Sequence, residues 1–338
     1  MSTHAPSKLS TLSTPAQSTV DLTAAFVVKQ LDRHRNQWTG AGRCPPLVVA
    51  VQGPQGSGKS YLASLLPQAL SLPENGSLRT ATLSLDDLYL PHTGLRAVAE
   101  SHPGNKLLDG RGQAGTHEVR LGLEVVRALK SGGDEAVEVP VFEKSLHGGE
   151  GDRLAREQWV RVENPSEVDV VVLEGWMVGF LPVSVHTPST TLEEIYSAAS
   201  KDPSGESTKA LLNIDYSPPF LLEHSLEDLK EVEGLLGREG YRELWAEVDV
   251  AVQIRPERMG FVWEWRLEQE HNMKAKNGGV GMTDEQVKNF IARYMPAYEL
   301  FLPGFSHSSQ SWVGKGDPKR GLRIRVGRGR EVVGVEEI

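Results

Sequence analysis

The chain has 338 residues, of which 39 % are apolar and 24 % charged, with one cysteine and a formal net charge of −9 at pH 7. This length suffices for one large or two small globular domains, and no apolar run approaches the roughly 20 residues of a membrane-spanning helix. A net negative charge disfavours binding to nucleic-acid phosphates, and without a membrane-spanning run we expect neither a nucleic-acid nor a membrane partner. One cysteine excludes an intrachain disulfide.

The first twenty residues are rich in Ser, Thr and Pro, and Lys8 is their only basic residue. They contain neither the apolar segment of a secretory signal nor the arginines of a mitochondrial presequence. We therefore expect residues 1–20 to be a disordered tail and the protein to be cytoplasmic, with a nuclear location as the alternative. From Val20 to about Trp38, apolar residues recur with helical spacing, which predicts a helix before the first strand.

A phosphate-binding motif follows the apolar run Leu47–Val51. It reads Gly53-Pro54-Gln55-Gly56-Ser57-Gly58-Lys59-Ser60, a complete G-x-x-x-x-G-K-S string, and a helix is expected from Tyr61 onward. Backbone N–H groups of such a loop and of the helix N-terminus form a cradle for an anion. Lys59 is placed to reach the β- and γ-phosphates, and the Ser60 hydroxyl to bind Mg²⁺. Residues 53–61 therefore predict a nucleoside triphosphate site; a strand-to-helix turn without a ligand is the alternative.

The rest of the chain alternates strands with helices. Strands are expected at 79–85, 136–142, 168–174 and 248–254, and helices at 117–130, 258–274 and from the Thr283–Gln286 capping box to about Leu300. Residues 91–116 are expected to form a substrate-side loop, 183–215 a flexible insertion, and 321–338 a peripheral hairpin. This order predicts a mainly parallel sheet in a three-layer α/β/α sandwich of the P-loop NTPase type, with residues 21–338 as a single domain.

Acidic residues stand where two of the expected strands end. Asp86 and Asp87 follow the second strand, and Glu174 ends a later one. Because parallel strands end on the edge that carries the phosphate loop, we expect these carboxylates to surround the γ-phosphate and its metal. Phosphoryl transfer needs a metal, cations and an acceptor for the proton of the attacking hydroxyl. We assign Asp86 as the base, with Asp87 as the alternative, and Ser60, Asp86 and Glu174 as the metal site; helix caps or solvated charges are the alternative for these acids.

Several ordered strings between residues 47 and 303 resemble those of one enzyme family. They include Ser84-Leu85-Asp86-Asp87-Leu88-Tyr89-Leu90, Pro140-Val141-Phe142-Glu143-Lys144-Ser145 and Trp265-Arg266-Leu267-Glu268-Gln269-Glu270, with further matches at 110–118, 151–153, 173–180 and 281–298. They resemble the D-glycerate 3-kinase-like proteins of fungi and plants, which are phosphate-loop kinases related to uridine kinase, phosphoribulokinase and pantothenate kinase. The resemblance implies ATP as donor, Mg²⁺ as cofactor and D-glycerate as acceptor, with 3-phosphoglycerate as product.

The resemblance also implies roles for individual residues. Asp86 falls on the catalytic aspartate. Arg266 falls on the lid helix, within the lid and C-terminal helices expected at 258–303, and its guanidinium is expected to join Lys59 at the phosphates. A surface ion pair with Glu270 is the alternative for Arg266. The expected contacts to the substrate carboxylate and free hydroxyl are Asp87, Arg111, His117, Lys144 and Arg153, each of which could instead be a solvated loop residue.

Two alternative functions are left open. The acceptor could be another hydroxylated metabolite, such as a nucleoside, pantothenate or a sugar. The protein could also be an ATP-binding regulatory or assembly factor that hydrolyses ATP slowly. The oligomeric state is not predicted.

Overall fold

The computed structural model describes residues 18–212, 220–276, 278–305 and 319–338. Its centre is a six-stranded sheet of order β10–β9–β8–β1–β7–β2. The strands are β1 (Leu47–Gln52), β2 (Thr80–Ser84), β7 (Val170–Gly175), β8 (Val250–Pro256), β9 (Gly321–Val326) and β10 (Val332–Glu337). All neighbouring pairs are parallel except β9–β10, which is antiparallel.

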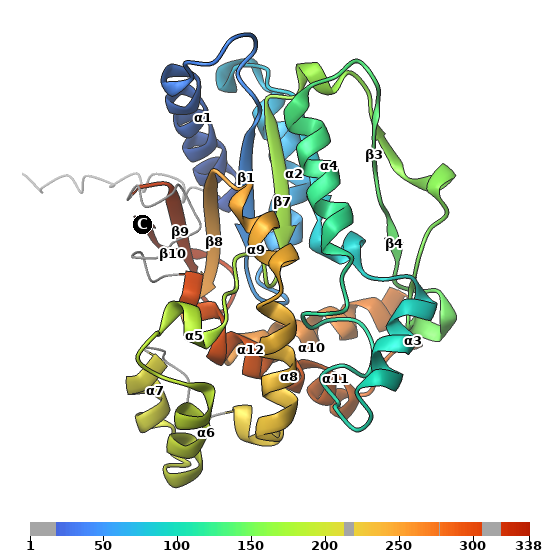
Figure 1. The fold of residues 1–338 in the computed structure, drawn as a ribbon, viewed down its shortest axis with the longest axis vertical. Coiled ribbons are helices and arrows are strands. Elements are labelled where there is room, and N and C mark those ends of the chain that lie inside the picture. The colour runs from blue at the N-terminus through green and yellow to red at the C-terminus, as the bar shows by residue number, and fades with distance from the viewer. Residues whose placement is uncertain (1–17, 213–219, 277, 306–318) are drawn as a thin grey trace, which may run out of the picture.

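The central strands are buried on both faces. Every residue of β1 and β7 is buried, as expected for continuous apolar runs within a parallel sheet. In register, Val49 of β1 lies opposite Val172 of β7 and Val250 of β8. The carboxyl ends of the five parallel strands therefore share one edge, the lower edge in Figure 1, and this edge is where ligands bind in such sheets.

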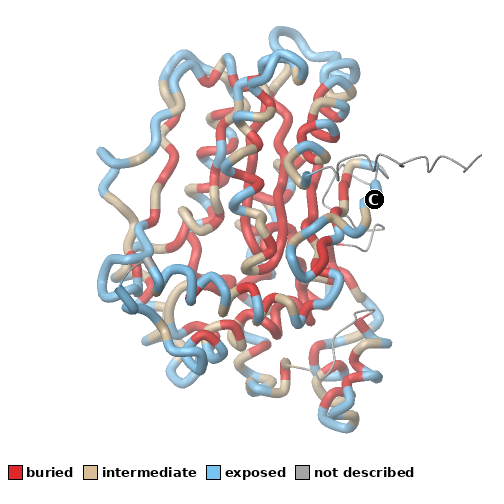
Figure 2. Tube along the Cα trace, turned by 180° about the vertical axis from the view of Figure 1, so that it is seen from behind, coloured by how far each residue is buried: buried red, intermediate tan, exposed pale blue. Residues whose placement is uncertain are grey.

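Helices cover both faces of the sheet. Helices α1 (Thr19–Gln37) and α2 (Lys59–Ser71) lie on one face, and α4 (Val119–Ser131) and α9 (Glu239–Ala246) on the other (Figure 1), which is the predicted three-layer α/β/α sandwich. Buried strands lie at the centre and exposed segments surround them (Figure 2). One apolar cluster extends from Ala24 to Val326, which supports the proposal of a single domain.

Helix α1 starts inside the segment expected to be a tail. Its N-cap is Ser18, whose side chain and that of Asp21 form a capping box, and the helix begins at Thr19. Residues 18–20 are therefore ordered, because a capping box satisfies the first N–H groups of the helix. Residues 1–17 lie outside the described residues.

The other main helices gather beyond the ligand edge of the sheet. They are α3 (His92–Ser101), α8 (Leu226–Leu236), α10 (Phe261–Lys276), α11 (Asp284–Ala292) and α12 (Met295–Leu300). The predicted capping box starts α11, but the prediction of one continuous helix to Leu300 was wrong. The chain turns at Arg293 and Tyr294, and α12 has Pro296 in its first turn, because proline is tolerated there but not inside a helix. Among the described residues, no helix combines the length and the apolar character needed to cross a membrane.

The expected substrate-side loop at 91–116 contains helix α3. The helix buries Leu95, and the segment after it buries Leu107 and Leu108. The many Pro, Gly and His residues of this segment interrupt its apolar pattern, so the few leucines that pack against the protein give no periodic signal.

The expected flexible insertion at 183–215 is also helical where the structure describes it. It forms α5 (Val183–His186), α6 (Leu192–Lys201) and α7 (Glu206–Leu212), and 213–215 lie outside the described residues. Thr191 and Glu194 form a capping box at the start of α6, and its buried residues are Leu192, Ile195 and Ala199. Their spacing of three and four places them on one face, so a short apolar stripe in a polar segment packs against the core.

The hairpin expected at 321–338 lies at one edge of the main sheet, where β9 pairs in parallel with β8 and β10 is the outermost strand. The strand expected at 136–142 is divided at Pro140 into β3 (Val137–Val139) and β4 (Phe142–Glu143), which pair outside the main sheet with β6 (Val160–Val162) and β5 (Asp152–Arg153). Short 3-10 helices lie in the connections along the chain, at Pro73–Asn75, Leu85–Leu88, His147–Gly149, Arg156–Gln158, Pro165–Glu167, Phe220–Glu223 and Leu302–Phe305.

Candidate active site

The phosphate loop connects β1 to α2 at the ligand edge. Gly56 and Gly58 have φ angles of +76° and +93°, a region that favours glycine. Gly58 is the N-cap of α2 and offers no side-chain acceptor to the first N–H groups of the helix, which leaves these donors for an anion. A Cβ atom on Gly56 would lie 2.5 Å from the Cβ of Trp265 in α10. The missing side chain therefore allows close packing of the loop against this helix.

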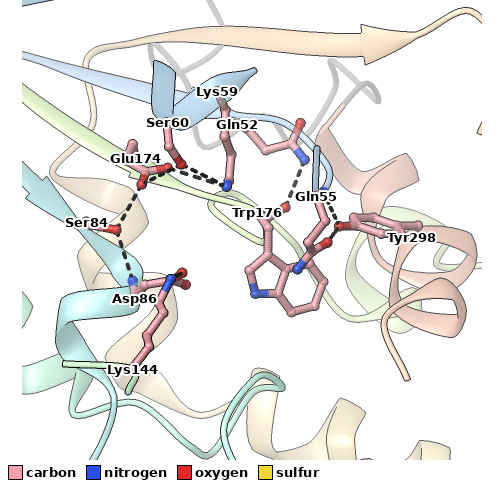
Figure 3. A network of polar contacts seen from close by, with 10 residues as sticks. All are labelled: Gln52, Gln55, Lys59, Ser60, Ser84, Asp86, Lys144, Glu174, Trp176 and Tyr298. Atoms are coloured by element: carbon pink, nitrogen blue, oxygen red, sulfur yellow. Dashed lines mark hydrogen bonds and ion pairs between the residues drawn. The ribbon is translucent and has the colours of Figure 1, made fainter. Parts of the chain in front are cut away.

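Tyr298 of α12 holds the loop from a second side (Figure 3). Its hydroxyl accepts the backbone N–H of Gln55 at 3.1 Å and donates to the side-chain oxygen of Gln55. Tyr298 is fully buried, and burial raises its pKa well above the usual value, so the hydroxyl stays protonated and remains a donor.

Two hydroxyl groups and one ammonium group converge on the carboxylate of Glu174 at the end of β7 (Figure 3). Ser84 Oγ lies 2.9 Å and Ser60 Oγ 3.4 Å from Glu174 Oε1, and Lys59 Nζ lies 3.8 Å from Oε2. Oε2 is buried and accepts no hydrogen bond from the described residues. Carboxylate and hydroxyl oxygens are ligands that Mg²⁺ prefers, so Ser60 and Glu174 fit a divalent cation beside the phosphate loop.

Asp86 lies in the turn Leu85–Leu88 directly after β2. Its backbone N–H donates to Ser84 Oγ at 3.2 Å, so Ser84 contacts both Asp86 and Glu174. Lys144, which follows β4, donates to Asp86 Oδ2 at 2.6 Å (Figure 3). Burial acts to raise the pKa of Asp86, but Lys144 and Lys59 together outweigh it and lower the pKa to about 2. The carboxylate is therefore ionised at neutral pH.

A single cavity of about 770 Å³ joins the phosphate loop to Asp86 and Lys144. The predicted site residues that line it are Gln55, Gly56, Gly58, Lys59, Ser60, Tyr61, Asp86, Arg111, Lys144 and Arg266. The loop residues Gly53, Pro54 and Ser57 shape the turn without lining the cavity. Donor-site and acceptor-site residues thus share one space.

Arg266 reaches this cavity from α10. Its Nη1 lies 2.8 Å from Glu270 Oε2, and the Glu270 side chain is only 1 % exposed. The ion pair with Glu270, which was the alternative role for Arg266, does form, but it is buried and not at the surface. The guanidinium also lies over the ring of Phe290, with Cζ 5.3 Å from the centroid. These contacts fix Arg266 in a position where it still faces the phosphate loop.

Arg111 lines the acceptor side of the cavity. Its Nη1 donates to the carbonyl oxygens of Gly149 and Glu150, the former at 2.6 Å, and its guanidinium lies 5.9 Å from the centroid of Phe142. Together with Lys144, it gives this end of the cavity a positive charge.

Asp87 and Arg153 do not line the cavity, in contrast to their expected role as substrate contacts. Asp87 accepts the backbone N–H of Phe142 at 3.0 Å and so fixes β4, which precedes Lys144. Burial raises the pKa of Asp87 to about 6, with a contribution from the charge of Asp86. Arg153 donates to the carboxylate of Glu118 and to the carbonyl oxygens of Leu88 and Tyr89. Both side chains support the walls of the site.

His117 is also buried behind the cavity wall. Its ring stacks on Tyr89 with 4.5 Å between centroids, and Nδ1 lies 3.1 Å from the hydroxyl of Tyr241. Burial lowers its pKa to about 4, so the ring is neutral at physiological pH. Its contact with Tyr89, which does line the cavity, makes it a support for that wall.

Several residues of the site were not predicted. Ser84 could have been found, because it is a polar residue at the end of the strand that precedes Asp86. Tyr298 and Arg330 reach the phosphate loop only through tertiary packing, and no local pattern marks them. Arg330 donates from Nε to the carbonyl oxygen of Gly56 at 2.7 Å. Trp176, Phe180 and Trp265 are each 1 % exposed and pack in the core, and Trp176 also lines the cavity.

The chain is similar to known kinases over most of its length, although no protein-family model matches it. A solved structure of D-glycerate 3-kinase from Cryptococcus neoformans var. grubii is 44 % identical, with a TM-score of 0.82, and the match covers 95 % of this chain and 100 % of that one. The uncharacterized kinase mug58 of Schizosaccharomyces pombe is 34 % identical over 78 % of this chain and 83 % of that protein. The chloroplastic D-glycerate 3-kinase of Arabidopsis thaliana is 31 % identical over 90 % of this chain and 58 % of that protein. With this identity, and with the phosphate loop and Asp86 lining one cavity, the chain belongs to the D-glycerate 3-kinase family of phosphate-loop kinases.

Proposed function

We propose that this kinase transfers the γ-phosphoryl group of Mg²⁺-bound ATP to the primary hydroxyl of D-glycerate, giving 3-phosphoglycerate and ADP. The observation that carries the proposal is the single cavity in which the phosphate loop faces Asp86, Lys144 and Arg111. One space can hold both a polyphosphate and a small anionic alcohol, which direct transfer between them requires. The similar Cryptococcus protein is named for this activity.

The acceptor end of the cavity suits a hydroxy acid. Arg111 and Lys144 supply the positive charge that a carboxylate needs, and a guanidinium can bind a carboxylate through two hydrogen bonds. Asp86, ionised beside Lys144, supplies the acceptor for the attacking hydroxyl. The primary hydroxyl of glycerate donates to Asp86 while the carboxylate lies toward the two cations.

The chain's own residues then act on the transferring group. Lys59 and Arg266 neutralise charge on the phosphate oxygens, the largest contribution that a protein makes to this reaction. Asp86 orients the hydroxyl and accepts its proton as the new P–O bond forms. Bound Mg²⁺ would polarise the phosphate oxygens, and Ser60 and Glu174 would hold it. Two side chains suffice for this role, because Mg²⁺ in kinases is bound mainly by substrate phosphates, waters and one or two carboxylates.

An acceptor screen tests this proposal. Purified protein with Mg²⁺ and ATP is given D-glycerate, L-glycerate, pantothenate, a sugar and a nucleoside, and the release of ADP is followed with and without each compound. Strong stimulation by D-glycerate alone supports the assignment. Stimulation by another compound would replace the acceptor. Stimulation by none would favour an ATP-binding regulatory or assembly factor with slow hydrolysis.

A further inference from the structure

The turn between β9 and β10 lies at the ligand edge of the sheet, although it is only a few residues from the C-terminal end of the chain. Strand β9 runs parallel to β8, so its carboxyl end points to the same edge as the phosphate loop. The backbone N–H of Glu257, just after β8, donates to the carbonyl oxygen of Val326 at the end of β9. Residues 327–331 follow, and they bring two arginines, Arg328 and Arg330, to this edge.

Arg330 connects the phosphate loop to α10. Its Nε donates to the carbonyl oxygen of Gly56 at 2.7 Å, and its Nη1 lies 2.8 Å from Glu268 Oε2. Arg330 has a φ of +67°, a conformation that is unfavourable for a residue with a side chain. The contacts of its side chain therefore help to hold the turn in a strained geometry.

The flat guanidinium of Arg330 has one covered face and one open face. Its Cζ lies 5.4 Å from the ring centroid of Trp265, and Trp265 is 1 % exposed, so the arginine covers the indole. The Arg330 side chain is itself 31 % exposed and lines the cavity. Nε and Nη1 already bind protein acceptors, so the face directed away from Trp265, which we call the open face, and Nη2 are the parts available to a ligand in the cavity.

We propose that the open face of Arg330 is one wall of the nucleobase site, on which the base of the bound nucleotide stacks. A planar, weakly hydrated guanidinium stacks well on aromatic rings, and every nucleobase has an aromatic face on which it can stack. Arg330 binds the carbonyl oxygen of Gly56 in the phosphate loop. A nucleotide whose phosphates bind the N–H groups of this loop is therefore long enough for its base to reach Arg330. This inference depends on one part of the proposed function, namely that the phosphoryl donor is a nucleotide.

The test compares two ligands that share a polyphosphate but differ in the base. Calorimetry measures the binding of Mg²⁺-ATP and of Mg²⁺-tripolyphosphate, without any acceptor, to the wild-type protein and to the Arg330→Ala variant. Stacking predicts that the substitution weakens ATP binding by about tenfold or more, while tripolyphosphate binding changes by less than about twofold. Arg330→Lys should not restore ATP binding, because an ammonium group has no plane to stack.

Arg328→Ala is the matched control. Arg328 is in the same turn and carries the same charge, but it is 74 % exposed, pairs with Glu264 at 2.5 Å and does not line the cavity. Its loss should leave the binding of both ligands unchanged. If the Arg330→Ala substitution abolishes the thermal unfolding transition, Arg330→Gly replaces it, since glycine adopts positive φ without strain.

Three results would overturn the proposal: equal weakening of both ligands, full rescue by Arg330→Lys, or unchanged ATP binding in Arg330→Ala. The first two would make Arg330 a phosphate contact or a support of the loop. Because no acceptor is present, a negative result here leaves the assignment of D-glycerate untouched, and a failed acceptor screen leaves this test intact.

Discussion

Lys144 Nζ lies 2.6 Å from Asp86 Oδ2, so the carboxylate proposed to accept the substrate proton shares its site with a cation proposed to bind the substrate. A carboxylate with a pKa of about 2 is a weak base, but it accepts a strong hydrogen bond. If the carboxylate of the bound substrate attracts Lys144, the ion pair between Lys144 and Asp86 weakens and Asp86 becomes more basic. The geometry thus links substrate binding to the basicity of Asp86.

Lys144→Met tests this link. Without the ammonium group, burial continues to raise the pKa of Asp86 and its largest opposing charge is gone. We expect the acid limb of the pH profile of kcat/KM to move upward, into the range of about pH 4 to 7, and KM for D-glycerate to rise by about tenfold or more. Steady-state kinetics between about pH 4.5 and 9 measure both across this range. Lys29→Met, at an exposed pair with Glu337, is the control, and an unmoved acid limb would refute the link.

Asp86→Asn should remove the proton acceptor while keeping the shape of the side chain. We expect kcat to fall by about 10²- to 10⁴-fold, with the affinity for Mg²⁺-ATP changed by less than about threefold. Rapid-quench kinetics and calorimetry separate the two quantities. Near-normal turnover in this variant would contradict the role of Asp86 as the proton acceptor.

Asp87→Asn should change the dependence of stability on pH. The pKa of Asp87 is raised to about 6 in the folded protein, against about 3.9 in the unfolded chain, so the folded state binds the extra proton between these values. Stability therefore falls as pH rises from about 4 to 6, by up to about 3 kcal/mol. The asparagine side chain does not titrate, so the variant should gain stability relative to the wild type over this range.

Urea unfolding of both proteins at about pH 4 and about pH 7 measures this difference, since these values bracket the titration. Asp86 does not interfere, because its stabilising ionisation is lost only below about pH 4. A difference in unfolding free energy that stays constant with pH would show that burial does not perturb Asp87.

Lys59→Ala should abolish ATP turnover without unfolding the protein. Lys59 is the cation of the phosphate loop and lies 3.8 Å from Glu174 Oε2, so its loss removes charge stabilisation at the transferred phosphoryl group. We expect kcat to fall by at least about 10³-fold, with a melting temperature within about 5 °C of the wild type. Retention of a tenth of the activity would contradict the assigned role of the loop.

The sequence predicts those parts of the site that are local. The phosphate loop is contiguous, Asp86 follows β2 and Glu174 lies at the end of β7, so topology alone places them at one edge. Lys144 and Arg111 come from loops with no periodic signal, and only resemblance to the family singles them out. Arg330 and Tyr298 meet Gln55 and Gly56 from more than 240 positions away in the chain, a relationship that no local pattern contains.

Sequence patterns are also silent on the direction of a side chain within a loop. Asp87, His117 and Arg153 are polar residues in family-matching strings, yet all three turn toward protein partners. Their partners are a backbone N–H, a tyrosine hydroxyl and two carbonyl oxygens. The short helices α3 and α6 were missed for a related reason, because few apolar residues in a polar segment suffice to anchor a helix to an existing core.

Identification of the product tests the central claim most directly. The wild-type enzyme is incubated with Mg²⁺, γ-³²P-labelled ATP and D-glycerate, and the labelled product is compared with 2- and 3-phosphoglycerate standards by chromatography and mass spectrometry. We predict label in 3-phosphoglycerate, in an amount equal to the ADP formed, and none with Lys59→Ala. Label found only in inorganic phosphate, with D-glycerate recovered unchanged, would contradict the account.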